Sequence, residues 1–180
     1  MVLVSALLYG ALQFSPQDIV NRPKEGQRVA FPDAYMVHMQ DRTFNREGRL
    51  AHTLQASDVT YFRSGDTMQG YIEQPKLAFF GENDSPPWHL VATQGTASSD
   101  QQSLLLTGNV NAFHEHQRYG RIDVTTDNLY INTETQIATT DKPVTMQSAR
   151  GTTSAIGLAA DLESGRVELL SEVKGTYDPN

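Results

Sequence analysis

The side chains with the greatest potential for chemistry in this chain of 180 residues are its 5 histidines and 21 acidic residues. The best metal-like fragment is His114-Glu115-His116, because a spacing of i, i+2 places both imidazoles on one side of a strand. No third ligand follows at a spacing typical of a metal site, and the segment 117–120 has the composition of a solvated turn. We therefore expect no metal here.

Paired carboxylates offer a second kind of chemistry, general acid and base catalysis of glycoside cleavage. Asp123 and Asp127 form such a pair, but close pairs arise by chance among 21 acidic residues. The sequence has no nucleophile elbow, no glycine-rich phosphate loop and no HExxH segment. It also has no cysteine, which excludes thiol catalysis and thiolate metal sites. We predict that the protein is not an enzyme and uses no cofactor.

Three further side chains have plainer interpretations. His38 and His52 lie among alternating apolar positions, where we expect partly buried polar side chains and not ligand-binding residues. Trp88 follows two prolines and is expected to fill a corner of the fold. The formal net charge of −7 makes nucleic acid an improbable partner, since phosphate binding needs a cationic face. It also argues against attraction to anionic lipid headgroups.

The first 14 residues, MVLVSALLYGALQF, contain no charge, and Pro16 ends the run. As a helix they span roughly 20 Å, which is short of the ~30 Å hydrocarbon core of a bilayer. A cleaved signal peptide, a buried core helix and an incomplete transmembrane helix are the three interpretations. We favour an incomplete transmembrane anchor over residues 1–15, and we expect the natural chain to begin upstream with Lys or Arg. A stalk is expected over residues 16–32.

From residue 33 to residue 178 the pattern predicts an all-β domain. Leu50, His52, Leu54 and Ala56 alternate on one face of a strand, as do Ile122 and Val124. Apolar residues are more continuous in the runs 77–80, 104–106 and 167–170, which predicts strands covered on both faces. Turns are expected at 45–48, 63–66, 81–84 and 163–165, where residues tolerant of positive φ gather.

Four segments of the chain resemble one another, and each is a strand, a tight corner and another strand. They are 69–76, 105–112, 138–145 and 168–175. Stacked units of this kind form a long, open, twisted pair of sheets whose apolar faces meet in a trough. The first and last strands are then unpaired edges that could accept a strand from another chain.

The order of several short motifs resembles the LptC family of lipopolysaccharide-export proteins. The motifs include Asn45-Arg46-Glu47-Gly48, Glu73-Gln74-Pro75, the segment from Pro87 to Ala112, and the ending from Gly151 to Gly175. The resemblance implies a β-jellyroll in the periplasm, anchored by one helix in the inner membrane. It also implies lipopolysaccharide as ligand, LptF and LptG (with the ATPase LptB) as partners of the helix and first strands, and LptA as the partner of the C-terminal edge.

The inward-facing positions are the candidate lipid contacts: Met39, Leu54, Ile72, Phe79, Leu90, Leu106, Val124, Ile131, Ile137, Met146 and Leu158. Met39 and Ile72 rank first because they match family positions that face lipid; for any one position, filling the core is an equal alternative. The candidate partner contacts are Gly48, Gly151, Val167, Leu169, Val173 and Tyr177. For the two glycines, a turn with positive φ is an equal alternative.

Two other functions stay open. One is a soluble bridge of the LptA kind, with the apolar N-terminus as a signal peptide. The other is an envelope carbohydrate-binding or hydrolytic β-protein that uses Trp88, Asp123 and His114.

Overall fold

A computed structural model describes residues 31–64, 66–81, 85–98, 102–116 and 120–177. The chain divides into two units, Met1–Phe31 and Pro32–Asn180. The predicted anchor over 1–15 and nearly all of the predicted stalk lie outside the described residues. Within those residues there is no helical segment with the length and apolarity that a membrane crossing requires.

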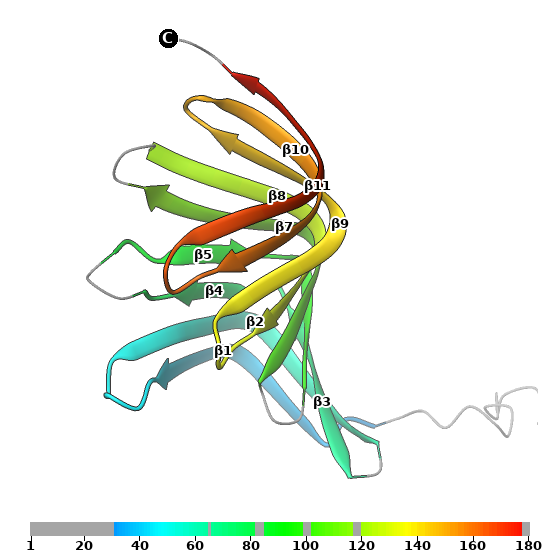
Figure 1. Cartoon of the computed structure of the whole chain (residues 1–180). Coiled ribbons are helices and arrows are strands. Elements are labelled where there is room, and N and C mark those ends of the chain that lie inside the picture. The colour runs from blue at the N-terminus through cyan, green and yellow to red at the C-terminus, as the bar shows by residue number, and fades with distance from the viewer. Residues whose placement is uncertain (1–30, 65, 82–84, 99–101, 117–119, 178–180) are drawn as a thin grey trace, which may run out of the picture. The chain divides into compact units, whose positions relative to one another are not determined.

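The second unit is all-β and antiparallel, as the sequence predicts (Figure 1). In the described residues the strands are β1 (Ala34–Phe44), β2 (Leu50–Ser64), β3 (Thr67–Glu73), β4 (Lys76–Phe79), β5 (Trp88–Val91), β6 (Gln94–Ala97), β7 (Ser103–His116), β8 (Gly120–Asn132), β9 (Ile137–Ser148), β10 (Gly151–Asp161) and β11 (Arg166–Tyr177).

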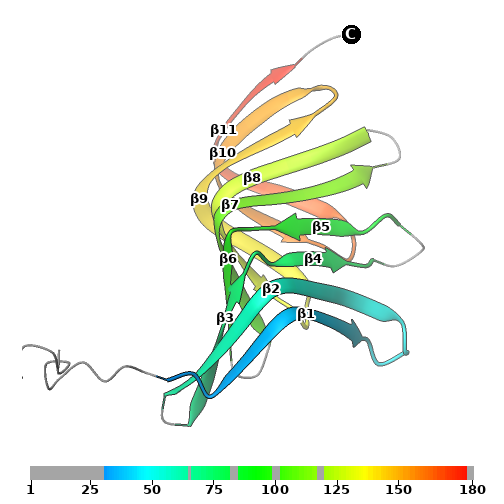
Figure 2. The same cartoon turned by 180° about the vertical axis from the view of Figure 1, so that it is seen from behind.

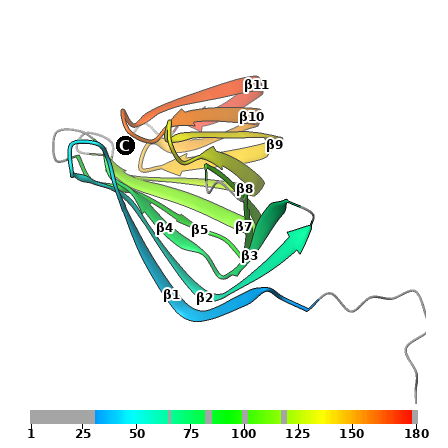
Figure 3. The same ribbon diagram turned by 90° about the horizontal axis from the view of Figure 1, so that it is seen from below.

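These strands form one sheet that is folded back on itself, and the long strands bend midway as they pass from one half to the other (Figures 2 and 3). The first part of β2 pairs with β4 and the last part with β3. The end of β7 pairs with β5 and its start with β6. β3 and β4 are in effect one bent strand interrupted at Gln74-Pro75, as β5 and β6 are at Ala92-Thr93.

We call the two halves of the folded sheet the first wall and the second wall. The first wall contains β4 and β5 with residues 39–44, 50–56, 110–116, 120–126, 143–148, 151–156 and 174–177. The second wall contains β3 and β6 with residues 34–37, 58–64, 103–107, 128–132, 137–140, 158–161 and 166–171.

The bends coincide with unusual backbone conformations, which explains the repeats in the sequence. Positive φ angles occur at His38 (52°), Gln74 (51°), Gly108 (74°), Asn109 (49°), Gly157 (81°) and Glu172 (49°). The strand register shifts beside several of them, as in β-bulges. Three of the four repeated segments contain such a residue, and the fourth crosses between the walls around Asp141. The predicted sequence of strand, corner and strand is therefore confirmed.

The hydrophobic core lies between the two walls. Phe79, Leu90, Leu106 and Ile131 are 0% exposed at its centre. Each strand contributes alternate side chains to it, which is the pattern that the sequence predicts for β2 and β8.

Three predictions about single segments are wrong. Leu105 and Leu170 point outward, with 38% and 57% exposure, so the runs 104–106 and 167–170 alternate instead of being covered on both faces. A solvated outer face tolerates a scattered leucine, so a continuous apolar run does not prove that both faces are covered. His38 is exposed because it lies at the corner of β1 rather than in a regular part of the strand.

The two edges of the sheet are β1, which pairs with β2, and β11, which pairs with β10. Within the described residues neither strand has a second neighbour. The predicted unpaired edges at the start and end of the domain are therefore present. Both edges carry exposed apolar side chains, among them Tyr35 and Val37 on β1 and Leu170 and Val173 on β11.

Candidate functional site

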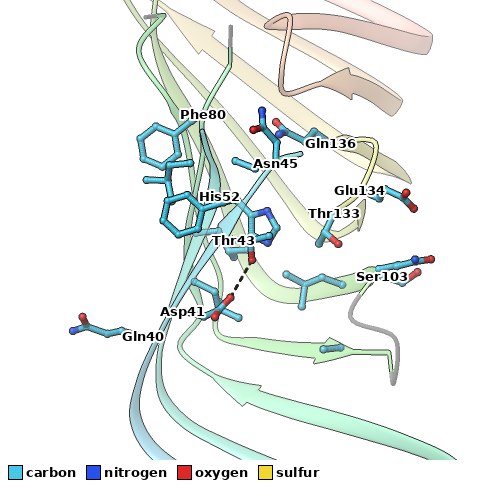
Figure 4. A pocket seen from close by; sticks show the side chains of 18 of the residues that line it. Gln40, Asp41, Thr43, Asn45, His52, Phe80, Ser103, Thr133, Glu134 and Gln136 are labelled. Atoms are coloured by element: carbon cyan, nitrogen blue, oxygen red, sulfur yellow. Dashed lines mark hydrogen bonds between the residues drawn. The ribbon is translucent and has the colours of Figure 1, made fainter. Parts of the chain in front are cut away.

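A cavity of about 990 Å³ lies between the walls at the end of the sheet formed by β1, β2 and β3. Figure 4 shows side chains of both walls facing each other across it. One side comes from β1, β2 and the turn between them. The other comes from the start of β7 and the turns after β8 and β10. Ligand pockets usually measure ~300–1,000 Å³, so this cavity has room for a sizeable group.

The inner part of the cavity is apolar because β1 and β2 direct alternate side chains into it. Met39 and Leu54 line it from the first wall and are half-buried, while Ile72 of the second wall is 2% exposed. Leu77 and Val59 complete this part. The surface is therefore suited to an aliphatic ligand, since its affinity for such a group comes from burial.

The rim of the cavity is polar. The turn between β1 and β2 is fixed by Asn45, whose Oδ1 accepts hydrogen bonds from the backbone N–H groups of Glu47 (3.1 Å) and Arg49 (2.9 Å). Ser103, Thr133 and Gln136 lie opposite (Figure 4). The charged lining residues are Asp41, Arg46, Glu47, Arg49, Glu134 and Glu163, so acids exceed arginines at the rim. Such a rim does not by itself attract an anionic headgroup.

His52 lies where the apolar part meets the rim. Its ring stacks on Phe79, with 5.3 Å between the centroids. Burial lowers the pKa of His52 below its usual value, although the carboxylate of Asp41 acts in the opposite direction. The imidazole is therefore neutral at pH 7, and Nδ1 finds no hydrogen-bond partner among the described residues.

The other end of the space between the walls is filled by side chains. A void of about 20 Å³ lies among them, lined by residues that include Val110 of β7, Val144 of β9 and Leu162 in the turn after β10. The trough predicted from the sequence is therefore open beside β1–β3 and closed beside β7–β11.

The candidate lipid contacts fall into several groups. Met39, Leu54 and Ile72 line the cavity; Phe79, Leu90, Leu106 and Ile131 lie in the closed core; and Val124 and Leu158 line the small void. Met146 packs against the core, and Ile137 is half-buried at the start of β9. The cavity thus contains both of the positions that the sequence ranked first.

The candidate partner contacts lie at turns and on the last strand. Gly48 (φ 76°) is in the turn after β1, and Gly151 (φ 139°) begins β10, so both conformations favour glycine. On β11, Val167 and Leu169 pack against the core, whereas Val173 is 53% exposed and Tyr177 ends the strand.

His114 and Asp123, which were candidates for metal binding and catalysis, contact other side chains of the fold. His114 is 7% exposed and stacks on Trp88, with 5.0 Å between the ring centroids. Asp123 accepts two hydrogen bonds of 2.8 Å from Arg121, which lower the pKa of its carboxyl group. No group of three or more His, Asp or Glu side chains suited to a metal occurs in the described part of the chain.

Several residues that line the cavity are not among those predicted from the sequence. Tyr61, Ala97 and Leu104 line the cavity from the second wall, and Gly81 and Glu163 line it from two loops. Alternation along β7 from Leu106 could have identified Leu104. The inward positions of β2 change from even to odd numbers between Ala56 and Val59, so alternation along residues 50–56 would place Tyr61 outward. Nothing in the sequence indicates that Gly81 and Glu163 meet, because they belong to different walls and lie far apart along the chain.

Comparisons with known proteins agree with the fold and the predicted family. A family model described as lipopolysaccharide-assembly, LptC-related, matches residues 1–178. The lipopolysaccharide export system protein LptC of Escherichia coli K12 is 31% identical over 143 residues, which are 78% of this chain and 72% of that protein. The protein of the same name from Shigella flexneri gives the same values.

A solved structure supports the architecture. This chain is similar to LptH of Pseudomonas aeruginosa, whose description is the LptA homologous periplasmic component of the conserved lipopolysaccharide transport device. The TM-score is 0.51 at 6% sequence identity, over 71% of this chain and 95% of that chain. The likeness concerns the fold alone.

Proposed function

The chain belongs to the family of lipopolysaccharide-assembly proteins related to LptC, and on that premise we propose that it is a lipopolysaccharide relay anchored in the inner membrane. It receives lipopolysaccharide from the transporter formed by LptB, LptF and LptG. Its β-domain, on the periplasmic side, hands the molecule to LptA. In this proposal the protein is a carrier and the energy comes from the partner ATPase.

The observation that carries the proposal is the cavity between the walls. Its inner part is lined by Met39, Leu54 and Ile72, and its rim is polar. Acyl chains would lie in the inner part, where each CH₂ group removed from water contributes about 0.8 kcal/mol. The sugars and phosphates would stay at the rim, in contact with solvent, so the excess of acids there does not have to be neutralised.

The free edges support a handover between domains. In the described residues β1 pairs only with β2 and β11 only with β10, so each strand has an unpaired edge. A jellyroll of a partner can add its own edge strand to either one, which would extend both walls and the space between them. We propose that β1 faces the transporter and that β11 faces LptA.

Photocrosslinking in living cells tests the lipid site. A photoreactive residue at Leu54, which is half-buried in the cavity, should form an adduct with lipopolysaccharide. Gln55 is the matched control, because it is the next residue on β2, is exposed and does not line the cavity. Ile72 and the exposed Tyr71 form a second pair of this kind. Equal adducts at the inner and outer position of both pairs would refute the proposal.

A further inference from the structure

At the mouth of the trough, between its open and closed parts, the backbones of the two walls approach each other closely. There the backbone of Gly81, which follows β4, meets the backbone of Glu163 in the turn after β10. A Cβ atom added at Gly81 would overlap the carbonyl oxygen of Glu163 and lie 3.4 Å from its carbonyl carbon. The φ angle of Gly81 is not positive, so glycine is needed here for space and not for conformation.

The turn that makes this contact is well ordered by local bonds. Asp161 Oδ1 accepts hydrogen bonds from the backbone N–H groups of Glu163 and Ser164, both 3.0 Å long. Leu162 is 3% exposed, and its N–H donates to the carbonyl oxygen of Gln136 in the neighbouring turn (3.0 Å). Residues 162–165 therefore form a compact unit, which we call the closing turn.

The contact lies on the boundary between two spaces. Gly81 and Glu163 both line the cavity of about 990 Å³, and both also line a separate space of about 260 Å³ with Trp88 and His114. Beyond Trp88 lies the closed core with its void of about 20 Å³. An aliphatic chain in the cavity thus meets the contact between Gly81 and Glu163 before it can extend toward β11.

We propose that Gly81 and the closing turn form a gate in the trough. When closed, the gate confines bound acyl chains to the cavity beside β1–β3, and their passage toward β11 requires the closing turn to move away from Gly81. The inference rests on the proposed function, since it concerns the same lipid and the same trough. It adds the residues that decide how far the lipid penetrates.

Trp88 gives a physical reason why the closed state can open. Its ring is 3% exposed under the closing turn, where a Cβ added at Gly165 would lie 4.0 Å from the indole Nε1. The buried indole N–H finds no hydrogen-bond partner among the described residues. A buried donor without a partner destabilises a fold. When the closing turn moves away, water can hydrogen-bond this N–H. That gain offsets part of the packing energy lost when the turn leaves Trp88.

The same residue provides the test, because Trp88 is the single tryptophan of the chain. We would measure acrylamide quenching of its fluorescence in the full chain, in membrane vesicles. Gly81→Ala should displace the closing turn and raise the quenching constant about threefold. Gly95→Ala is the control, because the φ of Gly95 is not positive either, but a Cβ added there would lie at least 3.4 Å from its nearest neighbours, which are side-chain atoms. Equal quenching in Gly81→Ala and wild type would overturn the proposal.

A second variant decides the outcome if Gly81→Ala does not fold. Leu162→Ala removes the buried anchor of the closing turn from the other side and should raise quenching in the same direction. Folding of each variant is checked by circular dichroism. Quenching by acrylamide that stays at the wild-type level in a folded Leu162→Ala protein would equally overturn the gate.

Transfer of lipopolysaccharide separates failure of the gate from failure of the proposed function. With bound lipopolysaccharide and purified LptA as acceptor, Gly81→Ala should transfer the lipid several-fold faster than Gly95→Ala and the wild type. Equal rates together with a wild-type adduct at Leu54 would refute the gate alone. Lack of any adduct at Leu54 in the wild-type chain would refute the lipid site itself.

Discussion

At the scale of single residues, His52 shows how the cavity constrains a titratable group. The ring is packed on Phe79 and its Nδ1 has no partner among the described residues. Burial disfavours the charged imidazolium more than the nearby Asp41 carboxylate favours it, so the pKa of His52 is lowered. A neutral imidazole at this position keeps the inner cavity compatible with aliphatic groups.

We therefore predict that His52 makes the stability of the fold depend on pH. Because its pKa is lower in the folded than in the unfolded state, the unfolded chain binds the proton first. The free energy of unfolding should fall as the pH is lowered from about 7.5 through the unfolded pKa of about 6.5, and it should level off below the folded pKa. His52→Gln, which cannot titrate, should reduce this dependence.

Urea unfolding at a series of pH values checks the prediction. The comparison concerns the slope of stability against pH and not the absolute stability of the variant, because Gln also changes the stacking on Phe79. Identical slopes for wild type and His52→Gln would contradict the assignment.

At the scale of elements, the edge strand β11 combines a corner with an exposed apolar surface. Glu172 has φ 49° at the corner, and the next residue, Val173, is 53% exposed. Proline at 173 would restrict the conformation of residue 172, so it would disturb the corner as well as the edge. A substitution that tests the β11 edge must therefore leave the backbone conformation at Glu172 unchanged.

We predict that Val173→Lys weakens pairing with LptA by about tenfold, which corresponds to ~1.4 kcal/mol. A lysine on an exposed edge strand opposes the addition of another strand. Stability should change by less than about 0.5 kcal/mol, since the side chain is on the surface. Titration calorimetry with purified LptA measures the affinity.

The control for this prediction is Gln147→Lys, which adds the same charge on an exposed position of β9, an interior strand. It should bind LptA as the wild type does. Equal weakening by both variants would indicate an effect of charge and not of the β11 edge.

At the scale of the whole molecule, the domain is one folded sheet that is packed differently at its two ends. A cavity of about 990 Å³ lies between the walls beside β1–β3, whereas the side chains of β7–β11 pack around a void of about 20 Å³. A cavity lowers the stability of a fold because the atoms that line it have fewer packing neighbours. A large cavity in a small domain is therefore consistent with a binding site. The proposed ligand supplies the missing neighbours.

This asymmetry predicts different effects for two similar truncations. Ile131→Ala, in the closed core at 0% exposure, should lower the free energy of unfolding by about 2–5 kcal/mol. Leu54→Ala, at the half-buried cavity wall, should cost less than about 2 kcal/mol but should weaken lipopolysaccharide binding. Urea unfolding and a lipopolysaccharide-binding assay separate the two effects. A larger stability loss for Leu54→Ala would contradict the distinction between core and cavity.

Much of the fold could be predicted from the sequence because it is recorded in local patterns. Alternation along residues 50–56 identifies the inner face of β2, and the repeated segments mark the corners at Gly108 and Glu172. The candidate site was predictable only as a set of inward positions. Phe79 and Ile72 are both predicted to face inward, yet one belongs to the closed core and the other lines the cavity.

By itself the sequence determined an all-β jellyroll with corners, two edges and an apolar inner face, because each of these depends on residues that are neighbours along the chain or in a repeat. The tertiary structure alone decided where the walls separate and where they meet. Whether an inward side chain touches the opposite wall depends on the spacing of the walls, and that spacing is set by contacts between distant segments. The approach of Glu163 to Gly81 is such a contact, and it lies between the cavity and the space beside Trp88.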